Sequence, residues 1–562
     1  SSQEIESGYR LACQTIMGGD IEVEIPEESR IGAPKILALG LERQTPLNPL
    51  VKKFHLKLQK PSLSDVKPDL ERLLEALSAI YKVHELEIDC EVLRKLPEIL
   101  RGANWDVTVT VWDNRRIIDV EPDDTSNKFW GVAVDIGTSK IVGHLVNLAT
   151  GATIDISSIE NPQISYGADI MTRITFAMTS EANLKTLQEI VIDGVNKILA
   201  QTFAKAKVNL HQVYEITIVG NTAMHHLFLG IQPKYTALSP YVPVVKSPMN
   251  VPAKELNIKI NPTGIVRVLP VIAGFVGADA VGDVLATGIH ESDELSLLID
   301  IGTNTEIFVG NSDDILSCSC ASGPAFEGAR VTHGMKAETG AIERVHIEKN
   351  FEVEYKTIGN VKPMGICGSA MIDVVAEMFK HGIINREGKF NPQMETPRLK
   401  RSNNQREFVV AWKHETLTHK EIIVTQKDIG EIQLAKAAIY AGCSILMKRK
   451  NVKRDNLDRI FIAGAFGNYI NPENAKLIGL VPDVPTRKIK FVGNTAVVGA
   501  KMALVSKEAS ETAELLSKKV RYNELAVDPE FNTEFFAAMF IPHKDPSRFP
   551  SVSKYFSVIK KT

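Results

Sequence analysis

The sequence predicts an α/β fold made mainly of two similar halves, because two short patterns each occur twice. Asp-Ile-Gly-Thr occurs within residues 134–140 and again within residues 299–305, each time directly after a short apolar run. Gly-Asn-Thr-Ala occurs at residues 220–223 and 493–496, again after apolar residues typical of a strand. Each tetrapeptide opens an apolar, helix-like segment with Asn or Thr placed as its cap. Repeated units of this kind predict two related half-domains.

The two Asp-Ile-Gly-Thr turns have the chemistry of a phosphate site. A glycine lets the backbone approach phosphate oxygens without a Cβ in the way, and the next residues add hydroxyl or amide donors. Asp135 and Asp300 each end an apolar run, so each carboxylate is placed to hold Mg²⁺ directly or through water. Asp-x-Gly alone is also a common turn. Two copies in β-rich sequence favour half-domains that close on one nucleotide.

A third segment fits the same interpretation. Residues 460–467 form an apolar run that ends in a Gly-Ala-Phe-Gly turn, against which a flat adenine can lie. The residues expected at the adenine are Gly464, Ala465, Phe466 and Gly467.

The order of these elements resembles that of the actin, sugar-kinase and heat-shock chaperone superfamily of ATPases, which have two ribonuclease-H-like halves. Longer motifs resemble one branch, the ATP-dependent reductive activators of corrinoid proteins; these motifs are residues 219–230, 273–279, 318–328, 365–369 and 425–429. The resemblance implies that ATP hydrolysis is coupled to one-electron reduction of Co(II) to Co(I) in a partner corrinoid protein. It also implies a [2Fe-2S] domain before the ATPase, a low-potential electron donor and a homodimer.

The resemblance assigns roles to individual residues. The catalytic pair is Asp135 and Asp300, which hold Mg²⁺, while Asp279 and Glu327 are candidates to orient the attacking water. A capping or structural role is an equal alternative for Asp279 and Glu327. The residues expected around ATP are Gly137, Thr138 and Ser139 on one side, Gly302, Thr303 and Asn304 on the other, and also Lys140 and Lys436. For Lys140 a solvated side chain is the alternative, and Lys436 is assigned by analogy alone.

In one respect the chain departs from the family pattern. A plant-type [2Fe-2S] cluster needs a Cys-x₄-Cys-x₂-Cys run and a distant fourth cysteine, and the sequence has no such run. The segment around Cys13 is similar to the one that carries the fourth ligand. The chain also begins with Ser1-Ser2. We therefore expect a truncated protein in which Cys13 binds no cluster; the alternative is an ordinary thiol in a complete chain.

Residues 318–322 leave three interpretations open. Cys318 and Cys320 alternate as strand residues do, so both can be small buried groups on one face. They could also hold half of a cluster shared across a dimer. In the third interpretation the loop meets the partner's corrinoid through Ser319 or Ser322.

Composition is that of a globular enzyme, with 44% apolar and 24% charged residues. Lys plus Arg number 65 and Asp plus Glu 68, so the net charge of −3 gives no reason to expect nucleic acid. Six cysteines, no secretory leader and no apolar run of membrane-spanning length predict a cytoplasmic protein without a membrane anchor.

Changes of pattern along the chain predict three parts. Residues 1–44 are expected to be a ferredoxin remnant with a linker, residues 45–126 a small α+β domain, and residues 127–562 the ATPase, with halves at about 127–290 and 291–562. In the small domain helices are expected at 63–81 and 92–100 and a hairpin at 112–115. The charged stretch 399–419 predicts a surface hairpin.

Two other classes of function remain open from the sequence. One is a small-molecule kinase of the same superfamily, and the other is a nucleotide-gated assembly or chaperone protein.

Overall fold

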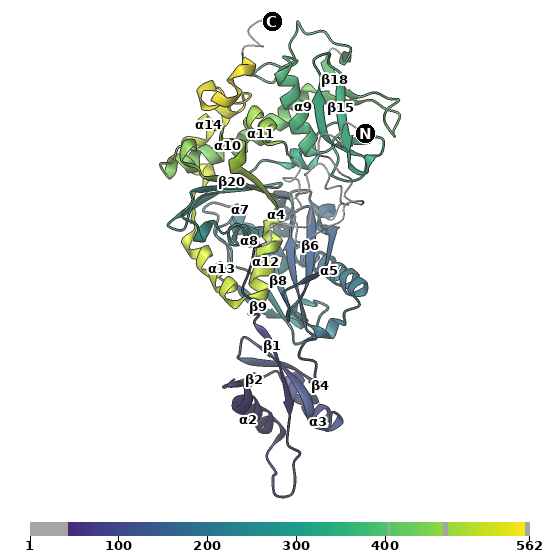
Figure 1. Cartoon of the computed structure of the whole chain (residues 1–562), viewed down its shortest axis with the longest axis vertical. Coiled ribbons are helices and arrows are strands. Elements are labelled where there is room, and N and C mark those ends of the chain that lie inside the picture. The colour runs from purple at the N-terminus through teal and green to yellow at the C-terminus, as the bar shows by residue number, and fades with distance from the viewer. Residues whose placement is uncertain (1–42, 403–404, 465–469, 557–562) are drawn as a thin grey trace, which may run out of the picture. The chain divides into compact units, whose positions relative to one another are not determined.

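The computed structural model describes residues 43–402, 405–464 and 470–556 of the 562 (Figure 1). The first part contains β1 (Val51–Lys57), α2 (Asp69–Tyr81), β2 (Glu87–Ile88), α3 (Cys90–Gly102), β3 (Asp106–Trp112) and β4 (Arg116–Pro122). The second part contains β5 (Trp130–Ile136), β6 (Lys140–Asn147), β7 (Thr153–Glu160), α4 (Ile170–Thr179), α5 (Glu181–Ala206), β8 (Val213–Gly220), α6 (Thr222–Phe228), α7 (Lys234–Ala237), β9 (Met249–Pro252), β10 (Ile265–Val268) and α8 (Ala278–Thr287). The third part contains β11 (Ser296–Ile301), β12 (Thr305–Gly310), β13 (Ile315–Cys320), β14 (Ala341–Ile347), β15 (Val353–Thr357), β16 (Gly365–Ile366), α9 (Gly368–Lys380), β17 (Leu399–Ser402), β18 (Gln405–Ala411), β19 (Ile422–Thr425), α10 (Gln426–Arg449), β20 (Arg459–Ala463), α11 (Pro472–Ile478), β21 (Ile489–Gly493), α12 (Thr495–Val505), α13 (Lys507–Lys519), β22 (Arg521–Tyr522) and α14 (Phe531–Ala538).

The first four strands form a small sheet in the order β1-β3-β4-β2, on which α2 and α3 pack around one apolar cluster. The expected hairpin joins β3 and β4, and Asp113 and Asn114 in its turn take positive φ angles. The predicted start of the first helix at Leu63 is wrong, because α2 begins at Asp69. Pro68 precedes it and disfavours helical geometry in the residue before.

Two six-stranded sheets share the topology of five strands, and the sixth strand lies at opposite edges of the two sheets. Their strand orders are β7-β6-β5-β8-β10-β9 and β21-β20-β11-β12-β13-β22. In each sheet three consecutive strands form an antiparallel meander, and the first of them also pairs in parallel with a later strand, β8 or β20. The prediction of an α/β fold with two similar halves is confirmed.

Helices α8 and α12 lie between the two sheets. One apolar cluster contains residues of both helices together with Ala133 and Val219 of the first sheet and Leu298 and Phe461 of the second. Figure 1 shows the two helices side by side near the level of β8 and β20. They cross with backbone contact, because a Cβ on Gly499 would lie 2.2 Å from the Gly282 carbonyl oxygen.

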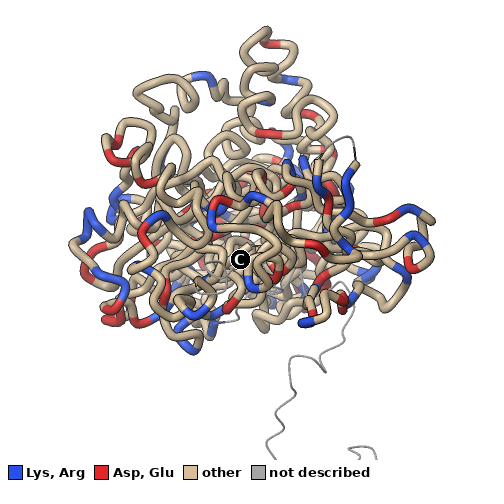
Figure 2. Tube along the Cα trace, turned by 90° about the horizontal axis from the view of Figure 1, so that it is seen from above, with Lys and Arg blue, Asp and Glu red and all other residues tan. Residues whose placement is uncertain are grey.

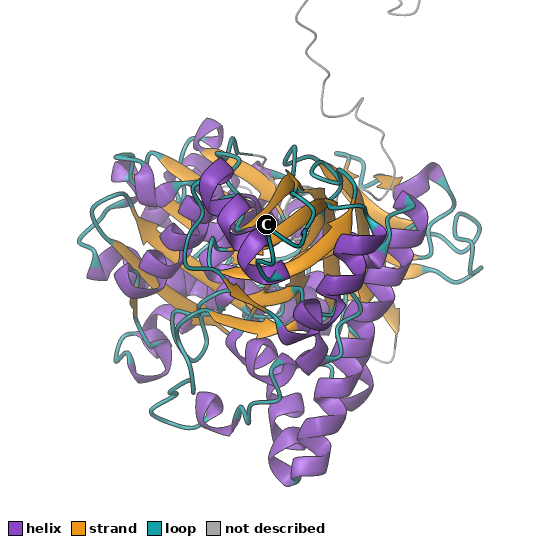
Figure 3. Ribbon diagram, turned by 90° about the horizontal axis from the view of Figure 1, so that it is seen from below, coloured by secondary structure: helices purple, strands orange, loops and turns teal. Residues whose placement is uncertain are grey.

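The outer faces of the sheets are covered by other helices. Helices α4, α5 and α6 pack on the first sheet, and α9 and α10 on the second. Figure 3 shows helices in purple around the orange strands. The predicted hairpin forms, since β17 and β18 pair antiparallel and residues 400–402 are exposed, but residues 408–411 of β18 are buried in the core.

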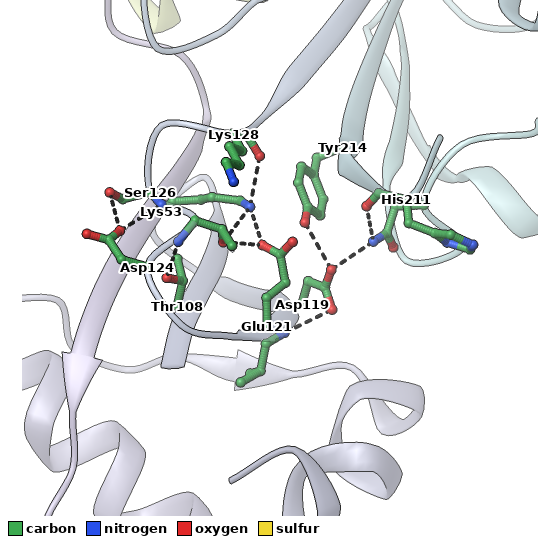
Figure 4. A network of polar contacts seen from close by, with 12 residues as sticks. Lys53, Thr108, Asp119, Glu121, Asp124, Ser126, Lys128, His211 and Tyr214 are labelled. Atoms are coloured by element: carbon green, nitrogen blue, oxygen red, sulfur yellow. Dashed lines mark hydrogen bonds and ion pairs between the residues drawn. The ribbon is translucent and has the colours of Figure 1, made fainter. Parts of the chain in front are cut away.

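Hydrogen bonds join the small sheet to the first large sheet (Figure 4). The Asp119 carboxylate on β4 accepts a bond from the Tyr214 hydroxyl at 3.0 Å and one from the Asn261 amide at 2.9 Å. Burial, reinforced by repulsion from Glu121, raises the pKa of Asp119 to about 6. The Lys53 ammonium pairs with Glu121 and donates to the Lys128 carbonyl at 3.0 Å. Polar contacts therefore join the small domain to the first large sheet, in addition to the apolar packing of Val51 and Ile118.

Figure 2 shows positions of Lys and Arg interspersed with positions of Asp and Glu along the chain trace. In the part of the chain that the structure describes, no helix is both long and apolar enough to cross a membrane.

The close contact between α8 and α12 can be tested by a substitution that adds one methyl group. We expect Gly499→Ala to lower the free energy of unfolding by about 2 kcal/mol or more, because the added Cβ meets backbone atoms of Gly282, which cannot rotate away. Gly430→Ala is the matched control, since Gly430 also lies in a helix but has no atom within 4 Å of its Cβ position. Gly430→Ala should raise the free energy of unfolding by up to about 1 kcal/mol, because alanine favours the helix more than glycine does. Chemical unfolding of the two variants measures both effects, and equal stabilities would contradict the close crossing.

Candidate functional site

The site forms where the two Asp-Ile-Gly-Thr turns meet the first turns of α8 and α12. Asp135 lies near the end of β5, and its carboxylate accepts a hydrogen bond at 3.0 Å from Asn494, the N-cap of α12. The Thr138 hydroxyl accepts one at 3.2 Å from Asn221, the N-cap of α6. Both repeated Gly-Asn motifs therefore cap helices, as predicted, and both caps also bind the first turn.

Five carboxylates gather around this point: Asp135, Asp279, Asp283, Asp300 and Glu306. Burial raises the pKa of Asp135 to about 7, and repulsion from Asp300 adds to this rise. Burial also raises the pKa of the other four carboxyl groups, and repulsion within the cluster adds to this in Asp279, Asp283 and Glu306. A divalent cation would relieve this repulsion. The sequence prediction included three of the five.

Asp283 and Glu306 are the carboxylates that the sequence interpretation missed. Asp283 follows Asp279 by one helical turn and accepts a bond from the Thr495 hydroxyl at 2.6 Å. Glu306 is the antiparallel partner of Asp300 across the second turn. Both positions follow from local geometry once the helix and the hairpin are recognised.

The oxygen-rich cluster fits Mg²⁺ by its chemistry. Among the described residues, however, no three side chains of His, Cys, Asp or Glu converge closely enough to bind one ion directly. An ion here would therefore keep water molecules among its ligands, as Mg²⁺ usually does.

Glu327 connects the two turns. It ends a short 3₁₀ helix, Pro324–Glu327, that follows β13. Its carboxylate accepts a hydrogen bond from the Ser139 hydroxyl at 2.7 Å and another from the Thr303 hydroxyl at 2.5 Å. One side chain thus bridges the turns of the two halves.

The first turn is also held by buried polar groups that the sequence interpretation missed. The Arg173 guanidinium is fully buried and donates to the Thr138 carbonyl at 2.6 Å. Burial lowers the pKa of Arg173 to about 10. The Asn161 side chain donates to the Gly137 carbonyl at 2.8 Å. These contacts fix the backbone of the turn through its carbonyl groups.

The second turn is closely approached by Gly464. Its φ angle is +103°, and a Cβ there would lie 2.3 Å from the Ile301 carbonyl oxygen. Only glycine fits this position. Ala465, Phe466 and Gly467, expected at the adenine, lie outside the described residues.

Within the second turn, the Gly302 amide donates to the Asn304 carbonyl at 3.1 Å. Lys140, the first residue of β6, is half-buried, and its role stays a prediction.

Lys436 does not belong to this site. Its ammonium group on α10 is buried and donates to the backbone carbonyls of Phe540 and Pro542. Burial lowers the pKa of this side chain well below its ordinary value. The predicted contact with nucleotide is corrected, because the ammonium instead anchors the C-terminal segment.

The serines expected to meet the corrinoid are engaged inside the fold. Ser322 is 6% exposed, and its hydroxyl lies 2.8 Å from that of Thr305. The Ser319 hydroxyl donates to Glu306 at 3.1 Å. Ser319 lies on β13 and is half-buried, Ser322 follows that strand, and the contact of these hydroxyls with a partner's corrinoid stays a prediction.

Cys318 and Cys320 are buried on one face of β13 and belong to the apolar core, which favours the first of the three interpretations. Burial raises the pKa of both thiols well above its ordinary value, so both remain protonated. Cys367 and Cys443 are also buried, whereas Cys90 is exposed. The described cysteines therefore form no set of thiolates that suits an iron–sulfur cluster. Cys13 lies outside the described residues.

The fold has two sheets that pack on two central helices, and each sheet carries one Asp-Ile-Gly-Thr turn. This arrangement is typical of the ASKHA class, which includes actin, the sugar kinases and the heat-shock chaperones. The chain belongs to the RACo family. Models of the RACo linker region, the RACo middle region and the C-terminal ASKHA domain of RACo match residues 40–127, 130–292 and 294–553.

Individual relatives agree with this family. The corrinoid activation enzyme RamQ of Eubacterium limosum is 35% identical over 529 residues, which cover 93% of this chain and 88% of RamQ. A Co(II) methylated amine-specific corrinoid protein reductase of Methanosarcina barkeri is 26% identical over 443 residues, 73% of this chain and 76% of the relative. The solved structure of a reductive activator for corrinoid, iron-sulfur protein has a TM-score of 0.85 and 38% identity, covering 98% of this chain and 90% of that one.

The environments of the cysteines predict an order of thiol labelling. In the native protein we expect an alkylating reagent to modify Cys90 at least tenfold faster than Cys318, Cys320, Cys367 or Cys443, because those four thiols are buried. In denaturant all five should react alike. Peptide mass spectrometry measures each site, and rapid native labelling of Cys318 or Cys320 would contradict their burial.

Proposed function

We propose that this chain is an ATPase that drives the reductive activation of a corrinoid protein. It would return the partner's cobalt from Co(II) to Co(I) with one electron from a low-potential donor. The observation that carries the proposal is that Asp135 and Asp300, from different halves, lie close enough to repel each other at the meeting point of two glycine turns. Family membership and the names of the relatives support the choice of a corrinoid protein as partner.

The residues of the two turns divide the work of phosphate chemistry. We assign Gly137, Thr138 and Ser139 to one side of the phosphates and Gly302, Thr303 and Asn304 to the other. Asp135 and Asp300 would hold Mg²⁺, which neutralises charge on the phosphates. Asp279 and Glu327 would orient the attacking water, and residues 464–467 would contact the adenine.

ATP is required because Co(II)/Co(I) couples have very low potentials. For a one-electron step, about 59 mV of unfavourable potential lowers the equilibrium ratio tenfold. A gap of a few hundred millivolts therefore needs roughly the energy of one or two ATP molecules.

Further assignments belong to the same proposal. The chain divides into residues 45–126, a small α+β domain, and an ATPase with halves at about 127–290 and 291–562. We propose that it works in the cytoplasm as a homodimer. A [2Fe-2S] cluster with Cys13 as one ligand is implied by the resemblance, but the described residues supply no ligand set for it.

The first test concerns hydrolysis. We expect Asp300→Asn to keep ATP affinity within a few-fold but to lower the hydrolysis rate by about 10²-fold or more, because the charge that orients Mg²⁺ is lost while the fold is kept. Asp313→Asn is the control, since Asp313 is an exposed residue between β12 and β13. Calorimetric binding and phosphate release measure the two quantities. Unchanged turnover in Asp300→Asn would remove this residue from the site.

The decisive test concerns the partner. If ATP drives reduction through complex formation, the chain must bind the Co(II) state more tightly than the Co(I) state, because a ligand shifts an equilibrium only by its differential affinity. By linkage, ATP and the Co(II) partner must change each other's affinity by the same factor. Titration of both cobalt states with and without ATP measures this. Equal affinities for the two states would contradict the coupling and favour the kinase or assembly alternatives.

A further inference from the structure

The position of Glu327 has a consequence for how nucleotide enters the site. Its two carboxylate oxygens accept bonds from one hydroxyl of each turn, Ser139 at 2.7 Å and Thr303 at 2.5 Å. These lengths are typical of hydroxyl groups that donate to an anion. Ser139 and Thr303 are also the hydroxyls that we assign to the phosphates of ATP.

The Glu327 carboxylate accepts from these two hydroxyls in the way that two oxygens of a phosphate group would. The two hydroxyls cannot donate to Glu327 and to a phosphate at once, because each hydroxyl has a single proton to donate. Like charge also keeps the carboxylate and the phosphate apart. The bridge and bound phosphate therefore exclude each other.

We propose that Glu327 is an internal competitor of the terminal phosphate of ATP, a latch that joins the two turns until nucleotide displaces it. The proposal rests on the proposed function and adds the regulation of that site. On displacement the hydroxyls exchange one anionic acceptor for another, so their hydrogen bonds are retained. The displaced carboxylate would move back from the phosphate far enough for a water molecule to lie between them, and it could orient that water.

The backbone on either side of Glu327 can transmit a displacement of its carboxylate to other segments. Phe326 before it is buried and packs against Gly368 at the start of α9, where a Cβ would lie 1.9 Å from the Phe326 carbonyl oxygen. Gly328 after it has a φ angle of +83°, which only glycine adopts readily. Gly328 is packed as well, since a Cβ there would lie 2.5 Å from the Met335 carbonyl oxygen. Displacement of the Glu327 carboxylate would therefore be transmitted through the backbone to residues 328–332.

In that following segment Ala329, Arg330 and Thr332 are exposed, whereas Gly328 and Val331 are buried. Arg330 is exposed and has a φ angle of +65°, which is unfavourable for a residue with a side chain. Two residues later, the Thr332 amide and hydroxyl bind Asp428 in the first turn of α10 at 2.8 and 2.9 Å. We name residues 328–332 the reporter segment, because it lies between the latch and α10.

The test measures nucleotide affinity rather than activity. Glu327→Gln keeps the size of the side chain and removes its charge, so the latch weakens while the fold is retained. We expect this variant to bind a non-hydrolysable ATP analogue about tenfold more tightly than wild type, with a smaller gain for ADP. Glu338→Gln removes the same charge from an exposed residue of the nearby loop and should leave both affinities unchanged.

A second measurement follows proteolysis of the wild-type protein and of Glu327→Gln. Trypsin cleaves after arginine, so the rate of cutting at Arg330 reports the conformation of the reporter segment. We expect the ATP analogue to change this rate at least threefold, and Glu327→Gln without nucleotide to show the rate of the nucleotide-bound wild type.

The outcomes separate the two proposals. If wild type binds the analogue but Glu327→Gln binds it no more tightly, the latch is overturned and Glu327 is left as a residue that orients water. In that case hydrolysis falls while affinity and cutting at Arg330 stay unchanged. If wild type binds no ATP at all, the proposed function fails and the latch fails with it.

Discussion

The architecture depends on the backbone contact between α8 and α12. A Cβ on Gly282 would lie 2.6 Å from the Ala496 carbonyl oxygen, and one on Gly499 would lie 2.2 Å from the Gly282 carbonyl oxygen. Two helices approach this closely only where side chains are absent. The two sheets pack on this pair, so the distance between the halves is set by two glycines in the middle of the molecule.

This close approach also assembles the polar site. The first two turns of α8 carry Asp279 and Asp283, and Asn494 caps α12, which begins at Thr495. The Asn494 amide donates to Asp135 on β5, and the Thr495 hydroxyl donates to Asp283 on α8. Residues at the start of α12 therefore bind carboxylates of two earlier elements of the chain. A shift of one helix past the other would separate these pairs. The burial that holds the helices together also raises the pKa of the cluster.

Local patterns in the sequence were enough to predict the repeated turns, the Asn caps and the two similar halves, because each depends on residues that are adjacent in the chain. Contacts between distant segments were not predictable in the same way. Arg173 holds the Thr138 carbonyl from 35 residues away, and Lys436 is captured by carbonyls of the C-terminal segment more than 100 residues later. The contact of the Ser322 hydroxyl with Thr305, at the start of β12, likewise joins residues that are 17 positions apart in the chain.

The segment before β1 pairs with the end of α12, which has a consequence for how the protein is made. The Asn48 amide donates to the Val505 carbonyl and the Asn48 carbonyl accepts from the Lys507 amide, both at 2.8 Å. At a synthesis rate of about 5–20 residues per second, Asn48 waits roughly 20 to 90 s for these partners. During that interval the face of the first sheet that α12 later covers is open to solvent. The nascent chain must therefore survive with an uncovered apolar sheet until nearly all of it has been synthesised.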